Sequence, residues 1–369
     1  MIPVFKPFYD DRELEALKPV FQSGWIGLGP KTKEFEEKFA KYIGVKYAIG
    51  VNSATAALHL AIDCFDIKDK EIITTPITFV SSNHIILYKG GIPVFCDVES
   101  DTMNIDPEKI ESLINKNTAG IIIVHYGGRS CEMDKIGEIC RQNNLFLIED
   151  CAHAAGGKYK NKMLGSIGDL GCFSFHAVKN IATADGGMVT TNNKEFYERI
   201  IKMRWLGITK DTFSRDLGHY SWYYDVIDFG FKYHMNDITA AIGIVQLEKL
   251  EDMNNRRREI VEIYNKELRE VGDIVPIAIK NYQFISAHNY VIKTAHRDKL
   301  NEYLKTKDIS TGVHYYPNHL YEIYKPYYRS CPVAEVEWKK LLTLPLYPAL
   351  INSEVKYVID EIKNFYNSL

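Results

Sequence analysis

The sequence Phe173-Ser174-Phe175-His176-Ala177-Val178-Lys179-Asn180, followed by Gly186-Gly187-Met188-Val189, places a lysine between two apolar segments. Residues 170–175 and 188–191 are short apolar runs of the kind that form buried strands. A lysine in the loop between such strands is held firmly and partly removed from water, which disfavours the ammonium ion and lowers the lysine pKa. An unprotonated lysine is the nucleophile that forms imines with carbonyl compounds. A lone lysine in a loop is more often an ordinary surface residue, so other motifs in the chain must show whether Lys179 is reactive.

The composition is that of a soluble globular protein and gives no sign of a nucleic-acid or membrane protein. The chain has 369 residues, with 46% hydrophobic and 25% charged residues, which suits two domains or one large domain with a smaller appendage. The net charge of −3 gives no reason to expect nucleic acid or an anionic membrane as a partner. Seven cysteines without a CxxC pair indicate a reducing cytoplasm and neither a disulfide framework nor a metal site. Apolar runs such as residues 119–124 are too short to span a bilayer, and the first residues lack a signal-peptide core.

Strands and helices alternate regularly through the first half of the chain. Strands are predicted at 71–75, 92–98, 119–125 and 145–149, and helices at 79–88, 107–114 and 133–143. This alternation predicts an α/β fold with a mostly parallel sheet covered by helices on both faces. Ligands of such sheets bind at the carboxyl ends of the strands.

The pattern changes near Asn236, where a long helix begins. We predict a large domain over residues 1–240 and a small C-terminal α/β domain over residues 241–369, with this helix joining them. The small domain is expected to hold strands at 290–293 and 312–315 and helices at 297–306 and 353–366. Three consecutive arginines, Arg256 to Arg258, lie beside several acidic residues and are interpreted as a solvated helix face.

Three further positions carry polar or aromatic groups where a ligand would lie. Ser53-Ala54-Thr55 falls between a strand and a helix, and can bind an anion or simply cap the helix. Asp150 ends an apolar strand, with His153 three residues later; the acid can face a ligand or cap the next turn. Phe79, at a strand-to-helix junction, can stack on a flat ligand or pack in the core.

Each of these signals has a structural explanation, but together they predict one chemistry. An anion site, an acid, an aromatic ring and a lysine are the parts that a pyridoxal phosphate (PLP) enzyme requires. The acid has a specific purpose, because a carboxylate paired with the ring N–H keeps the pyridine nitrogen protonated.

The chain resembles the DegT/StrS family of nucleotide-sugar aminotransferases, through motifs that follow one another in order along nearly its whole length. These include Ser23-Gly24-Trp25-Ile26-Gly27, Asn52-Ser53-Ala54-Thr55, Thr78-Phe79-Val80, His125-Tyr126-Gly127-Gly128, Glu149-Asp150-Cys151-Ala152-His153, the Ser174–Lys179 segment and His314-Tyr315-Tyr316-Pro317. The resemblance implies the PLP-dependent transferase type I fold, with a large domain and a smaller C-terminal α/β domain. It also implies a homodimer whose active sites are shared between subunits.

The resemblance also assigns residue roles. Lys179 matches the lysine that binds the cofactor covalently, and Asp150 the partner of its ring nitrogen. The other implied cofactor contacts are Ser53, Ala54, Thr55 and Ser174 at the phosphate, Phe79 on the ring, His153 near the ring hydroxyl and Lys232 from the partner subunit. Trp25, His314 and Tyr315 are implied substrate contacts.

Three segments depart from the family pattern. Gly230-Phe231-Lys232-Tyr233-His234 stands where Gly-Tyr-Asn-Tyr-Arg is usual, so the usual arginine is lost, although a lysine can still contact a phosphate as a point charge. Trp205-Leu206-Gly207 replaces Asn-His-Gly, and Ala184-Asp185-Gly186-Gly187 replaces Gly-Glu-Gly-Gly.

The predicted function is therefore transfer of an amino group from L-glutamate to a nucleotide-linked 4-keto sugar, for surface polysaccharide such as lipopolysaccharide or another glycan. The Ser-Phe-His-Ala-Val-Lys-Asn and His-Tyr-Gly-Gly motifs are most similar to those of enzymes that aminate C4 of UDP-linked sugars, such as the UDP-4-amino-4-deoxy-L-arabinose enzyme. A 3-keto-sugar aminotransferase and a non-catalytic PLP-binding regulatory protein remain alternatives. A dinucleotide-binding oxidoreductase has little support, because no GxGxxG motif follows a strand.

Overall fold

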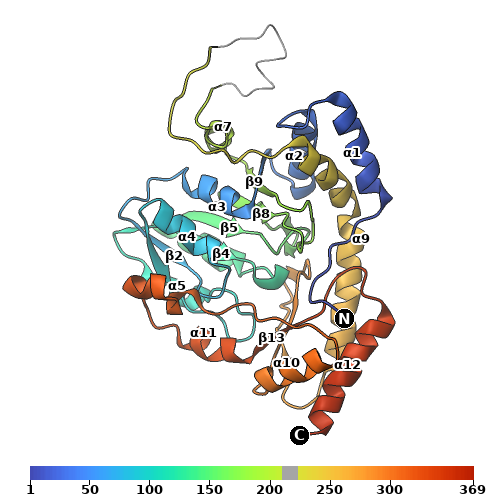
Figure 1. Ribbon diagram of the computed structural model, residues 1–369. Helices are drawn as coiled ribbons and strands as arrows, with labels where there is room; N and C mark the ends of the chain where they lie inside the picture. The colour runs from blue at the N-terminus through green and yellow to red at the C-terminus, as the bar shows by residue number, and fades with distance from the viewer. Residues whose placement is uncertain (210–222) are drawn as a thin grey trace.

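The computed structural model describes residues 1–209 and 223–369 and is built around a seven-stranded mixed sheet (Figure 1). The strand order is β1-β9-β8-β5-β4-β2-β3. In that order the strands are Tyr47–Val51, Gly187–Thr191, Leu170–Ser174, Phe146–Asp150, Thr118–Val124, Glu71–Thr74 and Ile92–Phe95. All neighbours pair in parallel except β9, which is antiparallel to both β1 and β8. The predicted mostly parallel α/β sheet is confirmed.

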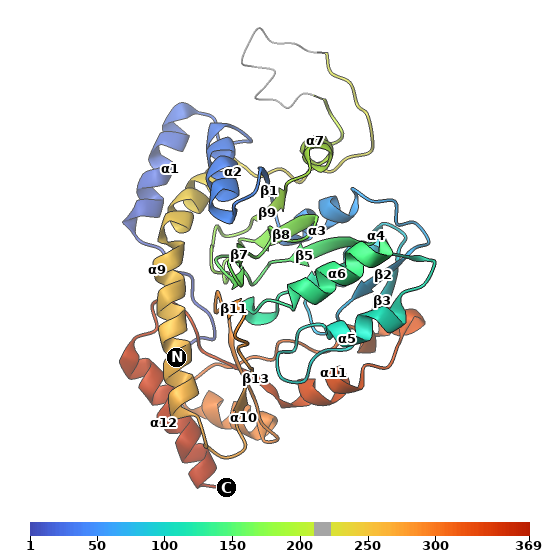
Figure 2. The same cartoon turned by 180° about the vertical axis from the view of Figure 1, so that it is seen from behind.

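Helices cover both faces of the sheet because its central strands are apolar on both sides. On β5, Leu147 packs in one core cluster, while Phe146 and Ile148 pack in the other, as alternating side chains must. Figure 1 shows α3 (Ala54–Ile62) and α4 (Ser81–Tyr88) in front of the sheet. The view from behind shows α6 (Met133–Asn143) and the short α5 (Pro107–Ile110) on the other face (Figure 2). The helix predicted over 107–114 ends early, and its last turn is the 3₁₀ helix η1 (Glu111–Leu113).

A 31-residue helix, α9 (Asp237–Glu267), runs along one side of the molecule and packs against α1 (Asp11–Ser23) and α2 (Pro30–Ile43). Its first residue also fixes α2: the Asp237 carboxylate accepts hydrogen bonds from the backbone N–H groups of Lys31 and Thr32, at 3.0 and 2.8 Å. An anion at this position satisfies unpaired donors and complements the helix dipole.

The C-terminal part forms a second core around α9, α10 (Arg297–Thr306), α12 (Asn352–Asn367) and a three-stranded sheet in the order β10-β12-β13. The strands are Val275–Pro276, Tyr290–Lys293 and Leu341–Leu344, and the short α11 (Pro332–Glu337) precedes β13. Helix α9 contributes to both cores, with Ile244 in the first and Ile260 in the second. The predicted division between residues 240 and 241 thus falls inside α9 and stays a prediction.

Two expectations about the C-terminal half are wrong. No strand spans 312–315: Gly312 alone pairs with Thr343, and the chain then turns so that His314 and Tyr315 reach a pocket. The arginine run is not a solvated face throughout, because α9 is covered on several sides in its middle. Arg257 is buried and its Nη1 lies 3.4 Å from Asn254 Oδ1.

Among the described helices, none combines the length and apolar character needed to cross a lipid bilayer.

Candidate active site

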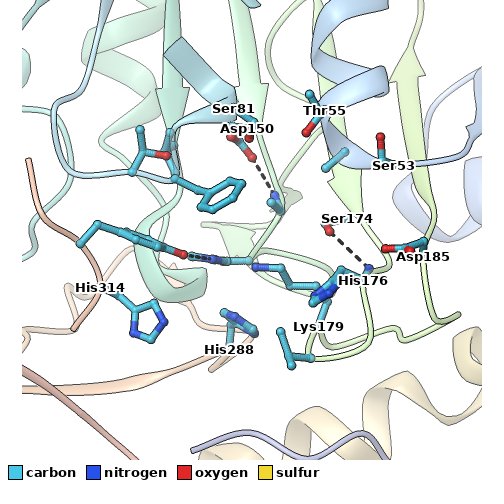
Figure 3. Close-up of a pocket in the computed structure, with 18 of the residues that line it drawn as sticks. Ser53, Thr55, Ser81, Asp150, Ser174, His176, Lys179, Asp185, His288 and His314 are labelled. Carbon is cyan, nitrogen blue, oxygen red and sulfur yellow. Dashed lines mark hydrogen bonds between the residues drawn. The ribbon is translucent and has the colours of Figure 1, made fainter. Parts of the chain in front are cut away.

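A pocket of about 390 Å³ lies at the carboxyl ends of β5 and β8 and brings together most of the residues predicted from the sequence (Figure 3). Its walls include Ser53, Ala54, Thr55, Phe79, Asp150, His153, Ser174, Lys179, His314 and Tyr315. Two predicted residues, Trp25 and Lys232, do not line it. The position agrees with the rule that α/β sheets bind ligands at the carboxyl ends of their strands.

Lys179 lies in the loop between the antiparallel strands β8 and β9, and its backbone N–H donates to the carbonyl of His176 at 2.8 Å. Burial lowers the pKa of Lys179 to about 8, and the Asp150 carboxylate opposes that change. The side chain forms no ion pair with any carboxylate in the described part of the chain. An amine with a lowered pKa and without an ion-pair partner among the described residues has the properties of a nucleophile or base rather than of a structural cation.

Asp150 is the last residue of β5 and is buried. Its Oδ2 accepts a hydrogen bond from Ser82 Oγ at 2.7 Å, and its Oδ1 accepts from the Ala152 N–H at 3.0 Å. Burial raises the pKa of Asp150, while these two donors and the Lys179 ammonium act in the opposite direction. A buried carboxylate of this kind gains most from a cationic N–H partner in the pocket.

The turn at Ser53 caps a helix and leaves backbone N–H groups that can bind an anion. Ser53 is the N-cap of α3, and its Oγ accepts from the Ala56 N–H at 3.1 Å. The N–H groups of Ala54 and Thr55 lie in the first turn, where the helix itself offers no carbonyl partner. At Gly187 of β9, a Cβ atom would lie only 2.6 Å from the Ser53 carbonyl carbon. Glycine is thus required for β9 to approach the turn, and Ser174 Oγ, which accepts from the His176 N–H at 3.4 Å, lines the same pocket.

Phe79 is 58% exposed although the preceding Thr78 is buried, and it lines the pocket. It lies in the connection before α4 rather than in a helix. Its ring centroid is 6.5 Å from that of Tyr315 across the pocket. A flat ligand can lie against this ring.

Hydrogen bonds determine which ring nitrogen of His153 carries the proton. Its Nδ1 accepts from the Gly127 N–H at 3.3 Å, so the proton resides on Nε2, which lies 3.1 Å from the Tyr315 hydroxyl. Burial, assisted by the Lys179 ammonium, lowers the pKa of His153 well below its usual value. This neutral ring stacks on His288 at a centroid distance of 4.3 Å.

His288 was not predicted from the sequence. Hydrogen bonds through two asparagine side chains determine which of its ring nitrogens carries the proton. Asn254 Nδ2 donates to the Ala155 carbonyl at 2.9 Å, so Asn254 Oδ1 is free to accept from Asn180 Nδ2 at 2.7 Å. Asn180 Oδ1 must then be the acceptor that faces His288 Nδ1 at 3.1 Å. His288 therefore carries its proton on Nδ1 and presents an unprotonated Nε2. Burial lowers its pKa well below the usual value.

A second buried cluster lies at the same ends of β4 and β5. His125, Glu149 and Cys151 come close enough to hold a metal ion. Glu149 and His125 are already used, however: Glu149 accepts from the Gly165, Ile167 and Gly168 N–H groups, and His125 Nδ1 accepts from the Cys131 N–H while Nε2 faces Glu149. This network holds the strand ends that carry Asp150 and supports no metal role.

Several pocket residues were missed by sequence reasoning, namely Phe5, His176, Asp185 and His288. Phe5, near the N-terminus, stacks on His288 with 5.1 Å between the two ring centroids. Asp185 had a signal, because it stands in a segment that departs from the family pattern. His176 also had a signal, because it stands in the motif that contains Lys179, but no role was assigned to it. Phe5 and His288 had none, since neither spacing nor residue type separates them from core residues.

The two predicted residues outside the pocket have local contacts of their own. Trp25 Nε1 donates to the Leu28 carbonyl at 2.9 Å. Lys232 Nζ lies 3.3 Å from the centroid of the Trp205 ring, and burial lowers its pKa. Their roles at substrate and phosphate stay predictions.

The pocket thus offers a nucleophilic lysine, a buried acid, an anion-binding turn and an exposed aromatic ring, which together fit PLP. On this fold, they define a PLP-dependent aminotransferase. The comparison with known families agrees: the chain belongs to the DegT/DnrJ/EryC1/StrS aminotransferase family, which it matches over residues 7–363.

Individual relatives match over almost the whole chain. The spore coat polysaccharide biosynthesis protein SpsC of Bacillus subtilis is 36% identical, covering 98% of this chain and 96% of its own. Among solved structures, Helicobacter pylori PseC, an aminotransferase involved in the biosynthesis of pseudoaminic acid, has a TM-score of 0.94 and 30% identity over 100% of both chains. The sugar aminotransferase Spr1654 of Streptococcus pneumoniae, described as putative and solved in a PLP form, has a TM-score of 0.92 and 30% identity over 100% and 99% of the two chains.

Proposed function

We propose that this protein transfers the amino group of L-glutamate to C4 of a nucleotide-linked keto sugar. The observation that carries the proposal is the placement of Lys179, with a pKa lowered to about 8, in one pocket with the buried Asp150. The involvement of PseC in pseudoaminic acid biosynthesis and of SpsC in spore coat polysaccharide biosynthesis supports a sugar substrate for a surface glycan. The motifs shared with enzymes that aminate UDP-linked 4-keto sugars, including the UDP-4-amino-4-deoxy-L-arabinose enzyme, favour C4.

The pocket geometry supports the cofactor contacts that we propose. Lys179 binds the cofactor covalently, and Asp150 accepts a hydrogen bond from its ring nitrogen. The first turn of α3, with Ser53, and the hydroxyl of Ser174 hold the phosphate, because they provide donors at the positive end of a helix. Phe79 would pack on the ring, and His153 would lie near the ring hydroxyl.

When bound, PLP supplies an electron-withdrawing ring that accommodates the electron pair left on the α-carbon of the amino donor. Lys179 Nζ accepts the proton that leaves this α-carbon, which requires the unprotonated amine that burial favours. Asp150 remains ionised against the ring N–H. Over a complete cycle, glutamate becomes 2-oxoglutarate and the C4 carbonyl of the sugar becomes an amine, so Lys179 gives back every proton that it takes.

We further propose a homodimer in the cytoplasm, in which Lys232 reaches the phosphate in the partner's pocket. The described Lys232 does not line the pocket of its own chain, as a residue used in trans requires. Trp25, His314 and Tyr315 contact the substrate, and the large and small domains divide within α9.

A panel of UDP-, dTDP- and GDP-linked 4-keto and 3-keto sugars, incubated with the protein, PLP and glutamate, tests this function by mass detection of the amino sugar. Amination of 4-keto sugars is expected. Amination of 3-keto sugars alone would establish the alternative regiochemistry. Failure of glutamate to yield 2-oxoglutarate even in a single turnover would favour a PLP-binding regulatory protein.

The covalent site is tested separately. The PLP-loaded protein should be yellow, and reduction with borohydride followed by peptide mapping should find the cofactor on Lys179. A label on any other lysine would contradict the assignment.

A further inference from the structure

The Lys179 loop is held by the residue after the lysine rather than by the lysine itself. Within the described part of the chain, Lys179 makes one hydrogen bond, from its backbone N–H to the His176 carbonyl at 2.8 Å. Asn180, in contrast, is only 3% exposed, and both ends of its side-chain amide are hydrogen-bonded. Asn180 therefore anchors the backbone that carries the lysine.

The Asn180 side chain connects this loop to α9 and to residues 286–288. Its Nδ2 donates to Asn254 Oδ1 at 2.7 Å and to the Ser286 carbonyl at 2.8 Å. Its Oδ1 lies 3.1 Å from His288 Nδ1 and accepts from it. These partners lie 74 to 108 residues further along the chain. One amide thus joins three segments that meet only in the folded protein.

These partners leave the Asn180 amide one orientation. A backbone carbonyl only accepts hydrogen bonds, so the atom that faces Ser286 must be Nδ2. Asn254 Oδ1 is an acceptor as well, because Asn254 Nδ2 donates to the Ala155 carbonyl at 2.9 Å. If the amide turned over, its oxygen would face two acceptors in a buried site, which is unfavourable. A buried amide with all these bonds made is costly to move, and it gives the loop a single position.

Both partners of the Asn180 Nδ2 group are bound in turn to the segment that follows β5. Ser286 Oγ donates to the His153 carbonyl at 2.7 Å, and Asn254 Nδ2 reaches the Ala155 carbonyl two residues later. The last residue of β5 is the buried acid of the site. The lysine loop and the acid are therefore linked through Asn180 by short hydrogen bonds.

We propose that Asn180 is a positioning residue for the reaction at Lys179. By tying the lysine loop to the segment after β5, it sets the distance from the Lys179 amine to Asp150 and keeps this amine in the buried part of the pocket. Asn180 itself does not line the pocket, so it acts through Lys179. The inference rests on the proposed covalent role of Lys179 and adds the residue through which the fold places it.

The first test is Asn180→Ala, which removes the three hydrogen bonds and adds no new group. The Lys179 amine should then reach water more easily, because the loop is no longer fixed. In the cofactor-free protein, half-maximal labelling of Lys179 by trace acetic anhydride should therefore move from near pH 8 upward by about one pH unit or more. In the PLP-loaded protein, conversion of glutamate to 2-oxoglutarate should fall about 10²-fold, as expected for a reacting group displaced by about 1 Å.

Two substitutions of Asn254 keep the test decisive if Asn180→Ala fails to fold. Asn254→Asp retains an oxygen facing Asn180 and places a carboxylate beside Arg257, whose Nη1 lies 3.4 Å from Asn254 Oδ1. Its glutamate reaction should stay within about threefold of the unmodified rate. Asn254→Leu removes the acceptor and should shift the labelling midpoint and the glutamate reaction in the same directions as Asn180→Ala.

Asn265→Leu is the matched control. Asn265 lies on the same helix as Asn254, and its Oδ1 accepts from the Tyr290 hydroxyl at 2.9 Å, away from the pocket. The variant loses one side-chain hydrogen bond, as Asn254→Leu does, and should change neither the labelling midpoint of Lys179 nor the glutamate reaction. Urea unfolding of each variant separates a loss of stability from a displaced lysine.

Two results would overturn the inference. One is a folded Asn180→Ala protein with an unchanged Lys179 midpoint and a glutamate reaction within about threefold of the unmodified rate. The other is equal loss of the glutamate reaction in Asn254→Asp and Asn254→Leu, since the oxygen facing Asn180 would then have no effect. A borohydride label on a lysine other than Lys179 in the unmodified protein would instead contradict the proposed function, so the two failures are distinguishable.

Discussion

The fraction of Lys179 that is unprotonated at neutral pH can be predicted from its pKa and measured directly. With a pKa of about 8, about one amine in eleven is unprotonated at pH 7. An ordinary lysine, with a pKa of about 10.4, has roughly one in 2,500. Burial therefore increases the reactive fraction of Lys179 by roughly 200-fold at neutral pH.

Competitive labelling of the cofactor-free protein with trace acetic anhydride, from pH 6 to pH 11, measures this fraction lysine by lysine after digestion and mass spectrometry. Labelling of Lys179 should reach half its maximum near pH 8. Lys160, whose pKa is raised by its contact with Asp134, is an internal reference that should titrate above the usual lysine range. In Asp150→Asn the Lys179 midpoint should fall, because the carboxylate raises the pKa of this amine. A midpoint above 10 for Lys179, or an upward shift in the variant, would refute the argument from burial.

The lowered pKa of Lys179 also predicts how the stability of the protein changes with pH. The pKa of Lys179 is lower in the folded than in the unfolded chain, so at pH values below 8 the folded state bears the whole cost of burying the ammonium ion. Lys179→Met should therefore stabilise the cofactor-free protein by at most about 3 kcal/mol at neutral pH. In urea unfolding the gain should shrink as the pH rises from 8 and vanish above about 10.4.

Three further predictions concern other positions. Asp150→Asn should retain PLP but lose about 10²-fold or more in turnover, because an amide cannot hold the protonated ring; near-normal turnover would contradict that role. Ala184 has a φ of +70°, a strained conformation for a residue with a Cβ atom. Ala184→Gly should therefore raise the free energy of unfolding, measured in urea, by up to about 1 kcal/mol. A lower free energy of unfolding in the variant would contradict this prediction. Lys179→Ala and Lys232→Ala homodimers should each be inactive, and mixing them should restore about a quarter of full activity, since half the dimers would have one intact site; subunit exchange without recovery would exclude a shared site.

The sequence predicted best those features that depend on local chemistry. The lysine between two apolar strands, the acid at the end of β5 and the Ser-Ala-Thr turn all combine a strand end with a polar group, and all three meet in the pocket. Phe5 and His288 could not be found in this way, because their stacking depends on the crossing of segments almost 300 residues apart. The expected strand at 312–315 fails for a related reason. Its alternating residues fit a strand, but the chain turns toward the pocket, where the Tyr126 hydroxyl, just after β4, donates a hydrogen bond to the His314 carbonyl.

The pairing of β1 with β9 also sets an order of events during synthesis. Among the named strands of the described residues, β1 (residues 47–51) pairs with β9 (residues 187–191) alone, so this edge of the sheet lacks its strand partner until some 140 further residues have left the ribosome. Long-range pairings of this kind are slow to form and leave aggregation-prone edges exposed in the meantime. Because Gly187 also packs on the turn at Ser53, a nascent chain that stops before β9 has neither a closed sheet nor a finished anion site. Because the chain grows from its N-terminus, we expect the cofactor site to form only after β9 and the preceding Lys179 loop have left the ribosome.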